Sequence, residues 1–310
     1  MAECESSLIQ GAFACTTNPA YCSKLFQSDS AYIHEKVKQI ATKEANANRA
    51  AEKVYHAVAK DLMDRFLPVY RASNGKSGFV TIQEDPRFEE DHEYILEASM
   101  RAKELNPNYM AKIPVTANGL PVIAEMVRLN IPICATEVFS IAQTIEVYRV
   151  YQEAVKKYGN KPVLYITHIT GIMDQYFKEL AAKERFSISS QALEMAGTII
   201  AMKEYRLLQE RGYEATMLGG GARNLQHFTN FVGGDLHITI NWSTAVELNE
   251  KYSKVERNID QDIPSAIVDE LLEKLPNFRR AYEENGMAVD EFAFCASQRL
   301  GMHCTAATRH

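Results

Sequence analysis

Several features that would define a class are missing from this sequence. No apolar stretch approaches the roughly 20 residues that a membrane helix needs. The acidic N-terminus, Met-Ala-Glu-Cys-Glu, has no basic run followed by an apolar segment, which argues against a signal peptide. No long basic stripe occurs, and the net charge of -6 argues against an electrostatic grip on nucleic acid. These absences predict a cytoplasmic protein whose partners include neither nucleic acid nor a membrane.

Cysteine is sparse and shows no framework spacing, with six residues in a chain of 310. A chain of this length can bury a large core without disulfide bonds, so a reducing compartment is favoured. Cys295, His303, Cys304 and His310 gather near the C-terminus. Their spacings match neither Cys-x-x-Cys nor His-x-x-x-His, so we expect no zinc site and no other metal.

The glycine motifs of nucleotide-binding proteins are also absent. No Gly-x-Gly-x-x-Gly opens a helix after an early strand, which weakens a dinucleotide-binding interpretation. Gly219-Gly-Gly221 could cradle an anion through its backbone N–H groups, but the Gly-Lys-Ser/Thr ending of a P-loop does not follow. We therefore expect no cofactor, and a nucleotide-dependent α/β enzyme is the weakest of the functional hypotheses.

Short apolar runs alternate along the chain with segments of helical period. Seven runs predict brief buried strands: Ala14–Asn18, Phe79–Glu84, Tyr109–Pro114, Ile133–Thr136, Val163–Thr167, Thr216–Gly219 and His237–Ile240. Between the runs, apolar residues recur every three or four positions and so share one helix face: Val54, Val58, Leu62 and Phe66; Ile95, Ala98, Ala102 and Leu105; and, less regularly, Leu193, Ala196, Ile200 and Lys203. The alternation predicts a parallel sheet covered by helices.

Seven strands are one short of a closed eight-stranded barrel, and an open doubly wound sheet is the alternative. No linker marks a domain boundary, so we predict a single domain over residues 1–310. Its C-terminal segment, about 262–310, is expected to be helical.

Lys112 is the candidate nucleophile, because it lies inside the otherwise apolar run Tyr109–Val115. In a parallel α/β barrel, catalytic groups gather at the carboxyl ends of the strands. Burial of an ammonium lowers the pKa of a lysine and yields a neutral amine that can attack a carbonyl. On position alone, a lysine that extends outward to solvent is an equal alternative.

Four sequence blocks in order resemble the transaldolase family of the class I Schiff-base aldolase superfamily. They are Cys15-Thr-Thr-Asn-Pro-Ala, the Lys112-Ile-Pro-Val-Thr-Ala-Asn-Gly119 strand and helix start, Thr136-Glu-Val-Phe-Ser-Ile-Ala-Gln143, and Gly221-Ala-Arg-Asn224. The blocks extend over about two-thirds of the chain, and four of them in order are fairly specific. The resemblance implies a divergent member with a (β/α)8 TIM-type barrel and a lysine imine formed with a ketose. It further implies transfer or release of a dihydroxyacetone unit in carbohydrate metabolism.

The resemblance also implies roles for individual residues. Lys112 matches the Schiff-base lysine, and Thr136 the threonine that helps to hold a catalytic water. Asn18 matches an asparagine that binds substrate hydroxyls, Thr167 replaces a serine, and Arg223 matches an arginine of the substrate phosphate site. An iminium on the lysine provides the electron sink for carbon–carbon cleavage, so the chemistry requires no metal.

Two positions near the lysine depart from the family pattern. Gln83 stands where the family carries a catalytic glutamate; an amide cannot accept a proton but can hold a water. The neighbouring Glu84 should face away from the barrel centre by strand alternation, unless a bulge intervenes. Cys134 replaces an asparagine that contacts the imine-bound substrate, and a small buried thiol without that role is the alternative.

Further departures concern the phosphate site and the start of the chain. Ile172 stands where the family has a second phosphate-binding arginine, which argues for a substrate without phosphate or with its anion placed differently. His168 is expected at the barrel mouth as a substrate-binding or acid–base group, with a structural histidine behind the site as the alternative. The family carries an aspartate on a first strand upstream of the Thr-Thr-Asn-Pro block, and we expect that strand to be missing from this sequence.

The sequence thus leaves three related functions open. The first is transfer of a three-carbon ketol unit, the second is aldol cleavage of a non-phosphorylated sugar, and the third is sugar binding without catalysis. In each case the partner is a small sugar or sugar phosphate. The oligomeric state is left open, a homo-oligomer included.

Overall fold

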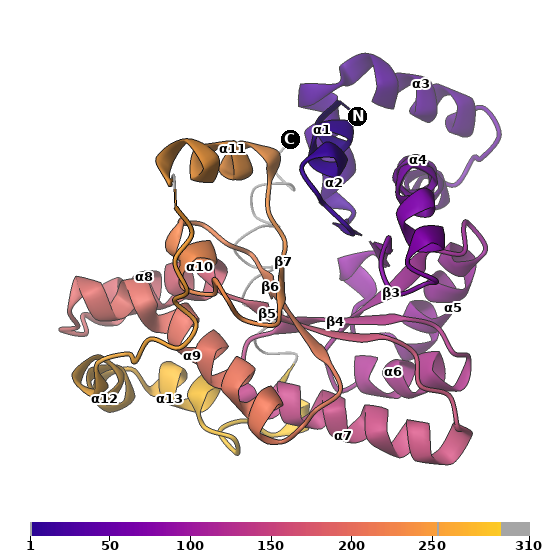
Figure 1. Ribbon diagram of the computed structural model, residues 1–310. Coiled ribbons are helices and arrows are strands. Elements are labelled where there is room, and N and C mark those ends of the chain that lie inside the picture. Colours follow the sequence, from indigo (N-terminus) through magenta and orange to yellow (C-terminus); the bar gives the residue numbers. More distant parts are fainter. Residues whose placement is uncertain (1, 253, 293–310) are drawn as a thin grey trace.

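A computed structural model describes residues 2–252 and 254–292, which form an α/β fold around one curled parallel sheet (Figure 1). The seven strands are β1 Cys15–Thr16, β2 Val80–Gln83, β3 Tyr109–Pro114, β4 Ile133–Val138, β5 Leu164–Ile169, β6 Thr216–Gly220 and β7 His237–Ile238. Each overlaps a predicted run, so the strand predictions are confirmed. The order is β1 to β7 without a reversal, and every pair is parallel. A doubly wound sheet would reverse its strand order, so that alternative is wrong.

The sheet curls until side chains at its two edges meet. The hydroxyl oxygens of Thr16, on β1, and Thr239, just after β7, lie 2.8 Å apart. The rings of Phe13 and His237 pack edge to face with their centroids 4.6 Å apart. This sequential, curled arrangement of parallel strands is the one that TIM-type barrels use. Among the described residues, those before β1 include a helix, α1 (Ala2–Ile9), and the expectation that the family's first strand is missing from this sequence stays a prediction.

Helices make up most of the rest of the described chain. Besides α1 they are α2 Ala20–Ser28, α3 Ser30–Ala41, α4 Ala47–Ala72, α5 His92–Lys103, α6 Gly119–Arg128, α7 Ile141–Tyr158, α8 Gly171–Glu184, α9 Ser190–Glu210, α10 Gln226–Thr229, α11 Trp242–Lys251, α12 Ser265–Lys274 and α13 Pro276–Tyr282, with 3-10 turns η1 Pro86–Phe88 and η2 Val289–Glu291. Helices α4 to α7 and α9 contact the strands directly, and Figure 1 shows α5, α6 and α7 along the outside of the curl.

The main core lies between this helical layer and the sheet. The predicted apolar face of α4 is confirmed, because Val54, Val58, Leu62 and Phe66 are all buried. On α5, Ile95, Ala98 and Ala102 are buried as predicted, whereas Leu105 lies beyond the end of the helix.

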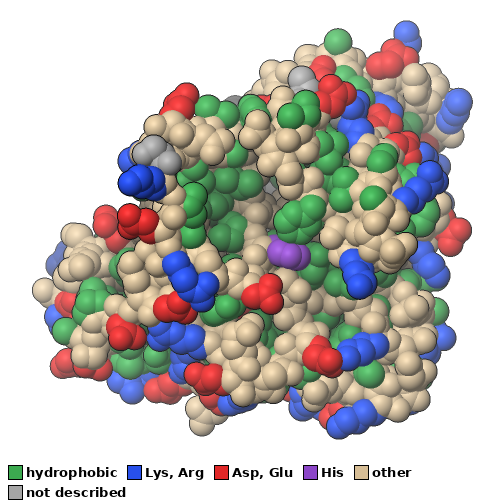
Figure 2. Space-filling view, in the orientation of Figure 1, with side chains coloured by type: hydrophobic (Ala, Val, Ile, Leu, Met, Phe, Trp, Pro, Cys, Tyr) green, Lys and Arg blue, Asp and Glu red, His purple; other side chains and the backbone are tan. Residues whose placement is uncertain are grey.

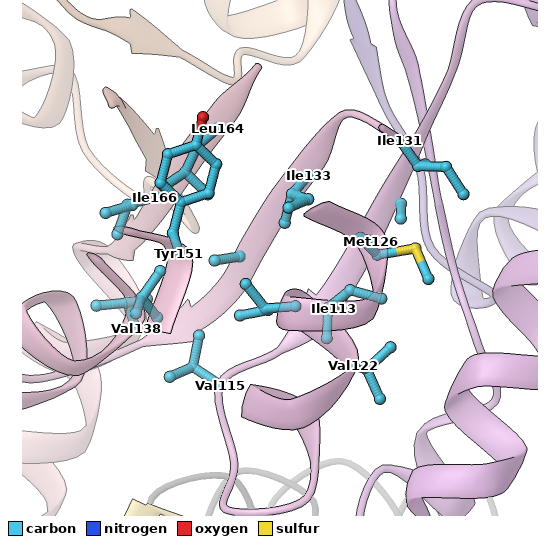
Figure 3. Close-up of a cluster of buried hydrophobic side chains, with 14 of the residues drawn as sticks. Ile113, Val115, Val122, Met126, Ile131, Ile133, Val138, Tyr151, Leu164 and Ile166 are labelled. Carbon is cyan, nitrogen blue, oxygen red and sulfur yellow. The ribbon is translucent and has the colours of Figure 1, made fainter. Parts of the chain in front are cut away.

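Strands β3 to β5 and helices α6 and α7 meet in the centre of that core. Figure 3 shows Ile113, Ile133 and Ile166 of the strands close to Met126 of α6 and Tyr151 of α7. These strand side chains are fully excluded from solvent, and each contributes about 1.5–3 kcal/mol through burial. This packing fixes the direction of the outward-facing side chains. Because side chains alternate along a strand, it also fixes the direction of those that face inward.

A second cluster fills the inner side of the curl. It consists of Phe79, Met110, Cys134, Tyr165 and Leu218, which come from five successive strands or their starts. Residues two positions further along each strand face the same way. The next inward position on β3 is therefore Lys112, toward the carboxyl edge of the sheet.

In the described part of the chain, no helix combines the length and the apolar character needed to span a membrane. Figure 2 shows acidic and basic side chains interspersed over the face that it presents. The segment expected to be helical begins with α12 and α13, while Cys295, His303, Cys304 and His310 lie outside the described residues.

Candidate active site

Lys112 lies in a row of three side chains on neighbouring strands. The register pairs Gln83 of β2 with Lys112 of β3, and Lys112 with Cys134 of β4. Residues paired in this way point to the same face of a sheet, here the inner face. The Lys112 side chain is half-buried, and its Nζ donates a hydrogen bond of 3.3 Å to the carbonyl oxygen of Thr17. The lysine is thus directed across the inner side toward the β1 loop.

The tight connection after β3 holds this strand end in place. Helix α6 begins at Gly119, and a Cβ there would lie 1.9 Å from the carbonyl oxygen of Pro114. Only glycine allows such an approach without a shift of the backbone. The Gly119 N–H also donates to the Thr116 hydroxyl at 3.0 Å. The sequence around the lysine therefore selects a sharp strand-to-helix turn.

Cys134 and Thr167 form a small polar contact beside the lysine. The Cys134 Sγ lies 3.2 Å from the Thr167 hydroxyl, and both side chains are buried. Burial raises the pKa of the Cys134 thiol, although the Lys112 charge and the Thr167 hydrogen bond oppose the rise. The thiol is therefore neutral at physiological pH and adds a weak donor rather than a thiolate. Thr136, the expected water-holding residue, is buried on β4 opposite Pro114 in the register.

Gln83 contacts a carboxylate that the sequence interpretation did not include. Its Nε2 donates a hydrogen bond of 3.1 Å to Oε1 of Glu137, and the Glu137 side chain is only 2% exposed. The register of β4 is irregular between Ala135 and Val138, and Glu137 has a φ of +66°. The signal that could have revealed this residue is a glutamate inside the apolar β4 run, directly after Thr136.

Glu84 lies just beyond the last residue of β2, where strand alternation no longer fixes its direction. Its side chain is buried and lies within electrostatic reach of both Lys112 and Glu137. Burial raises the pKa of Glu84 to about 8, its own backbone N–H and Lys112 lower it, and Glu137 adds to the rise. Glu84 is therefore a neutral carboxyl group at pH 7, outside the row that contains Lys112.

This raised pKa predicts a pH-dependent stability. In the unfolded chain Glu84 loses its proton near its ordinary pKa, whereas in the folded chain it keeps the proton to about pH 8. The folded state binds more protons in that window, so the free energy of unfolding should fall as the pH rises from 5 to 8, by on the order of 3 kcal/mol. Urea denaturation at several pH values measures the slope. Glu84→Gln should flatten it, and an unchanged slope in that variant would contradict the assignment.

The loop after β1 is anchored by Thr17. The Thr17 hydroxyl lies 2.6 Å from the Tyr55 hydroxyl of α4 and donates to the Thr81 carbonyl oxygen at 2.6 Å. Its backbone N–H donates to the Thr81 hydroxyl at 3.1 Å. Asn18 follows directly and is exposed, next to the carbonyl that Lys112 contacts. The loop therefore presents the Asn18 side chain at the carboxyl edge.

A buried histidine holds the turn that carries Arg223. The backbone N–H groups of Arg223 and Asn224 donate to His227 Nδ1 at 3.0 and 3.2 Å. His227 Nε2 therefore carries the proton, and it lies 2.6 Å from Asp174 Oδ2, while the Gly197 N–H donates to the other Asp174 oxygen at 2.7 Å. The sequence interpretation missed both residues, because 53 positions separate Asp174 from His227.

An apolar side chain borders the same turn. Gly221 has a φ of +64°, and a Cβ there would lie 3.1 Å from Cδ1 of Ile172, at the start of α8. The Arg223 side chain is exposed, and its Nη1 contacts the carbonyl oxygens of Gly221 and Ala222 at 3.4 and 3.2 Å. The turn at the carboxyl edge thus carries one cation, Arg223, and borders the aliphatic side chain of Ile172.

His168 lies apart from the Lys112 row. Its Nδ1 is 2.8 Å from Oε2 of Glu204 on α9, and both side chains are completely buried. Since the neighbouring Thr167 faces inward to Cys134, His168 faces the outer helical layer. The expectation that His168 lies at the barrel mouth is therefore wrong, and the residue occupies the position of a structural histidine behind the sheet.

Within residues 2–252 and 254–292, no three His, Cys, Asp or Glu side chains are grouped as metal ligands. The structure brings together Gln83, Lys112, Cys134 and Thr167, with the unpredicted Glu137 next to Gln83. Chemically, this group offers an amine, a carboxylate, an amide and two weak donors on the inner side of a curled parallel sheet. An amine and a carboxylate at such a site suit carbonyl chemistry.

Comparison with known proteins points to one family. Residues 4–293 match the family model for transaldolase and fructose-6-phosphate aldolase. Transaldolase 1 of Streptomyces avermitilis is 33% identical over 144 residues, which cover 46% of this chain and 38% of that protein. Transaldolase 1 of Streptomyces coelicolor is 26% identical over 223 residues, which cover 68% and 58%. The transaldolase of Mycobacterium leprae is 25% identical over 221 residues, which cover 67% and 58%.

These matches extend over about two-fifths to three-fifths of the length of the relatives. The identities are modest, in keeping with the departures at Gln83, Cys134 and Ile172. The family model, by contrast, covers nearly the whole chain. The chain therefore belongs to the transaldolase/fructose-6-phosphate aldolase family.

Proposed function

We propose that this chain is a transaldolase-like enzyme that forms a Schiff base between Lys112 and a ketose. The observation that carries the proposal is the position of Lys112, on the inner side of the sheet between Gln83 and Cys134. Membership of the family supports the proposal, because the strand that contains Lys112 resembles the family's Schiff-base strand. The carbonyl of Thr17 accepts a hydrogen bond from the amine and orients it across the inner side.

The first step joins the amine to the ketose. The lone pair of Nζ attacks the C2 carbonyl carbon. One proton from the amine and one taken up from solvent leave with the carbonyl oxygen as water, and an iminium ion remains. The bond between C3 and C4 then breaks as the C4 hydroxyl loses its proton. The electron pair of the C3–C4 bond forms the C2–C3 double bond of an enamine, and the iminium nitrogen recovers its lone pair. The C4 fragment departs as an aldehyde, and no metal is needed to hold the electrons.

The fate of the enamine separates the two catalytic functions. In a transferase, C3 attacks the carbonyl carbon of an acceptor aldehyde, and hydrolysis of the new imine releases a longer ketose. In an aldolase, C3 takes a proton and hydrolysis releases dihydroxyacetone. The transferase is the first choice, because the relatives named above are transaldolases.

The turn at Arg223 bears on the substrate. One exposed guanidinium next to the aliphatic Ile172 is a weaker phosphate site than two cations would be. This arrangement favours a sugar without phosphate, or one whose phosphate contacts Arg223 alone. The resemblance assigns Asn18 to the binding of substrate hydroxyls, and the exposure of this residue on the β1 loop supports that role.

A sugar-binding protein without catalysis is the second candidate, favoured by the neutral groups Gln83 and Cys134 beside the lysine. The test is turnover of fructose and fructose 6-phosphate, each with and without an acceptor aldehyde such as erythrose 4-phosphate. Product formed only with acceptor supports a transferase, and free three-carbon ketone supports an aldolase. Binding seen as a melting shift without any product from either ketose would overturn the enzymatic proposal.

A further inference from the structure

The Gln83–Glu137 pair lies where an acid–base group for carbon–carbon cleavage would be required. Gln83 is paired in register with Lys112, so the two side chains lie next to each other on the inner face. The hydrogen bond from Gln83 Nε2 brings Oε1 of Glu137 to within 3.1 Å of that amide. Strand β4 thus supplies a carboxylate, Glu137, that contacts Gln83, the neighbour of Lys112.

The backbone conformation at Glu137 indicates that the fold imposes the direction of this side chain. Glu137 has a φ of +66° in a strand, a conformation that a non-glycine residue rarely adopts and that costs on the order of 1 kcal/mol. The register irregularity between Ala135 and Val138 is a bulge-like feature, and such features redirect side chains next to functional sites. Gln143 Nε2 holds the same segment by donating to the carbonyl oxygen of Glu137 at 3.1 Å.

The other buried carboxyl groups nearby are less suited to accept a proton. Glu84 retains its proton at neutral pH, because burial raises its pKa to about 8. Glu89 is also buried, but it follows η1, outside the strands that carry the row of Lys112, and its backbone carbonyl oxygen accepts a hydrogen bond from the Thr116 hydroxyl. Gln83 itself is an amide and cannot act as a base. Glu137 is therefore the carboxylate best placed toward the row of Lys112.

We propose that Glu137 is the general base and acid of the Schiff-base reaction and that Gln83 positions it. The inference rests on the proposed function. In cleavage, a Glu137 oxygen accepts the proton of the C4 hydroxyl as the C3–C4 bond breaks and the C4 oxygen forms the aldehyde carbonyl. In the reverse direction with an acceptor, the neutral Glu137 returns that proton to the alkoxide formed when C3 attacks. In the family pattern this carboxylate is a glutamate at the position of Gln83 on β2. In this chain Glu137 on β4 supplies it.

The primary test is Glu137→Gln, which keeps the size and the hydrogen bonding of the side chain but removes the base. The variant should still form the imine, so borohydride with a ketose should still add mass at Lys112. Turnover should fall by about 100-fold or more, as loss of a general base does. A purely structural role would instead reduce trapping and turnover together, along with the melting temperature.

Two further variants sharpen the test. Glu84→Gln removes a buried carboxyl group that is already neutral, so its turnover at pH 7 should stay within about threefold of the unsubstituted chain. In the double variant Gln83→Glu/Glu137→Gln, the amide and the carboxylate exchange strands within the same contact. The turnover of this double variant should be at least about tenfold higher than that of Glu137→Gln alone, because a carboxylate is again next to Lys112.

The outcomes separate the inference from the function on which it rests. If the unsubstituted chain traps ketose and Glu137→Gln turns over at the same rate, the assignment of Glu137 is overturned while the Schiff base stands. The same holds if Glu84→Gln, and not Glu137→Gln, abolishes turnover. If the unsubstituted chain traps no ketose and makes no product, the proposed function fails and the inference fails with it.

Discussion

Replacing Lys112 with methionine should lower turnover of any ketose by at least about 1,000-fold. Methionine retains the length and much of the packing of the half-buried side chain but provides no nucleophilic amine. Without an iminium, the electron pair of the breaking bond has no acceptor, and the remaining groups can only bind and orient the sugar. The measurement is the single-turnover rate at saturating ketose, compared between the two proteins.

The matched control for this variant is Lys112→Arg. Arginine keeps a positive charge at the same place but is never neutral in proteins, so it cannot form the imine. If both variants lose turnover while their melting temperatures stay near that of the unsubstituted chain, the role of Lys112 is covalent. Turnover that survives in Lys112→Arg would instead indicate an electrostatic role and would contradict the Schiff base.

Replacing Glu204 with leucine should lower the free energy of unfolding by about 3 kcal/mol. The change leaves His168 completely buried without the carboxylate that its Nδ1 contacts at 2.8 Å. An unsatisfied polar group in the space between β5 and α9 carries most of this cost. Urea denaturation of the two proteins at pH 7 measures the difference.

The double variant His168→Phe/Glu204→Leu supplies the control for the buried pair. It removes both polar groups, so it should recover at least half of the lost stability. Because His168 faces the outer helical layer, turnover of the folded double variant should stay close to that of the unsubstituted chain. A loss of turnover without a loss of stability would show that His168 acts in the reaction after all.

Most of the fold followed from local patterns in the sequence. The runs Tyr109–Pro114 and Thr216–Gly219 were predicted within one residue, because buried parallel strands are continuously apolar and end at proline or glycine. The apolar face of α4 also followed directly from its four-residue spacing. The extent to which the sheet curls did not follow from local patterns, because the contact that shows it, between Thr16 and Thr239, joins residues 223 positions apart.

The geometry of the candidate site was predictable where strand register alone determined it. The row of Gln83, Lys112 and Cys134 needs only regular pairing between neighbouring strands. Glu137 was missed because a positive φ and a register irregularity cannot be inferred from a single sequence. His168 was misplaced although alternation was informative: an inward Thr167 requires its neighbour to face outward.

The network around Arg223 escaped prediction for a different reason. His227 accepts hydrogen bonds from the turn and contacts Asp174, which lies on α8. Such a network depends on how α8 and α9 pack after β5 and β6, and it leaves no periodic trace in the sequence. Long-range polar contacts of this kind become visible only when the chain is folded.

The most direct test of the central claim is to identify the residue that carries a trapped ketose. The protein is incubated with fructose 6-phosphate or fructose, reduced with borohydride, digested and mapped by mass spectrometry. We expect a ketose-derived mass increase on the peptide that contains Lys112, absent without ketose and absent in Lys112→Met. An unmodified Lys112 peptide under conditions where the ketose is turned over, or an adduct confined to another lysine, would contradict it.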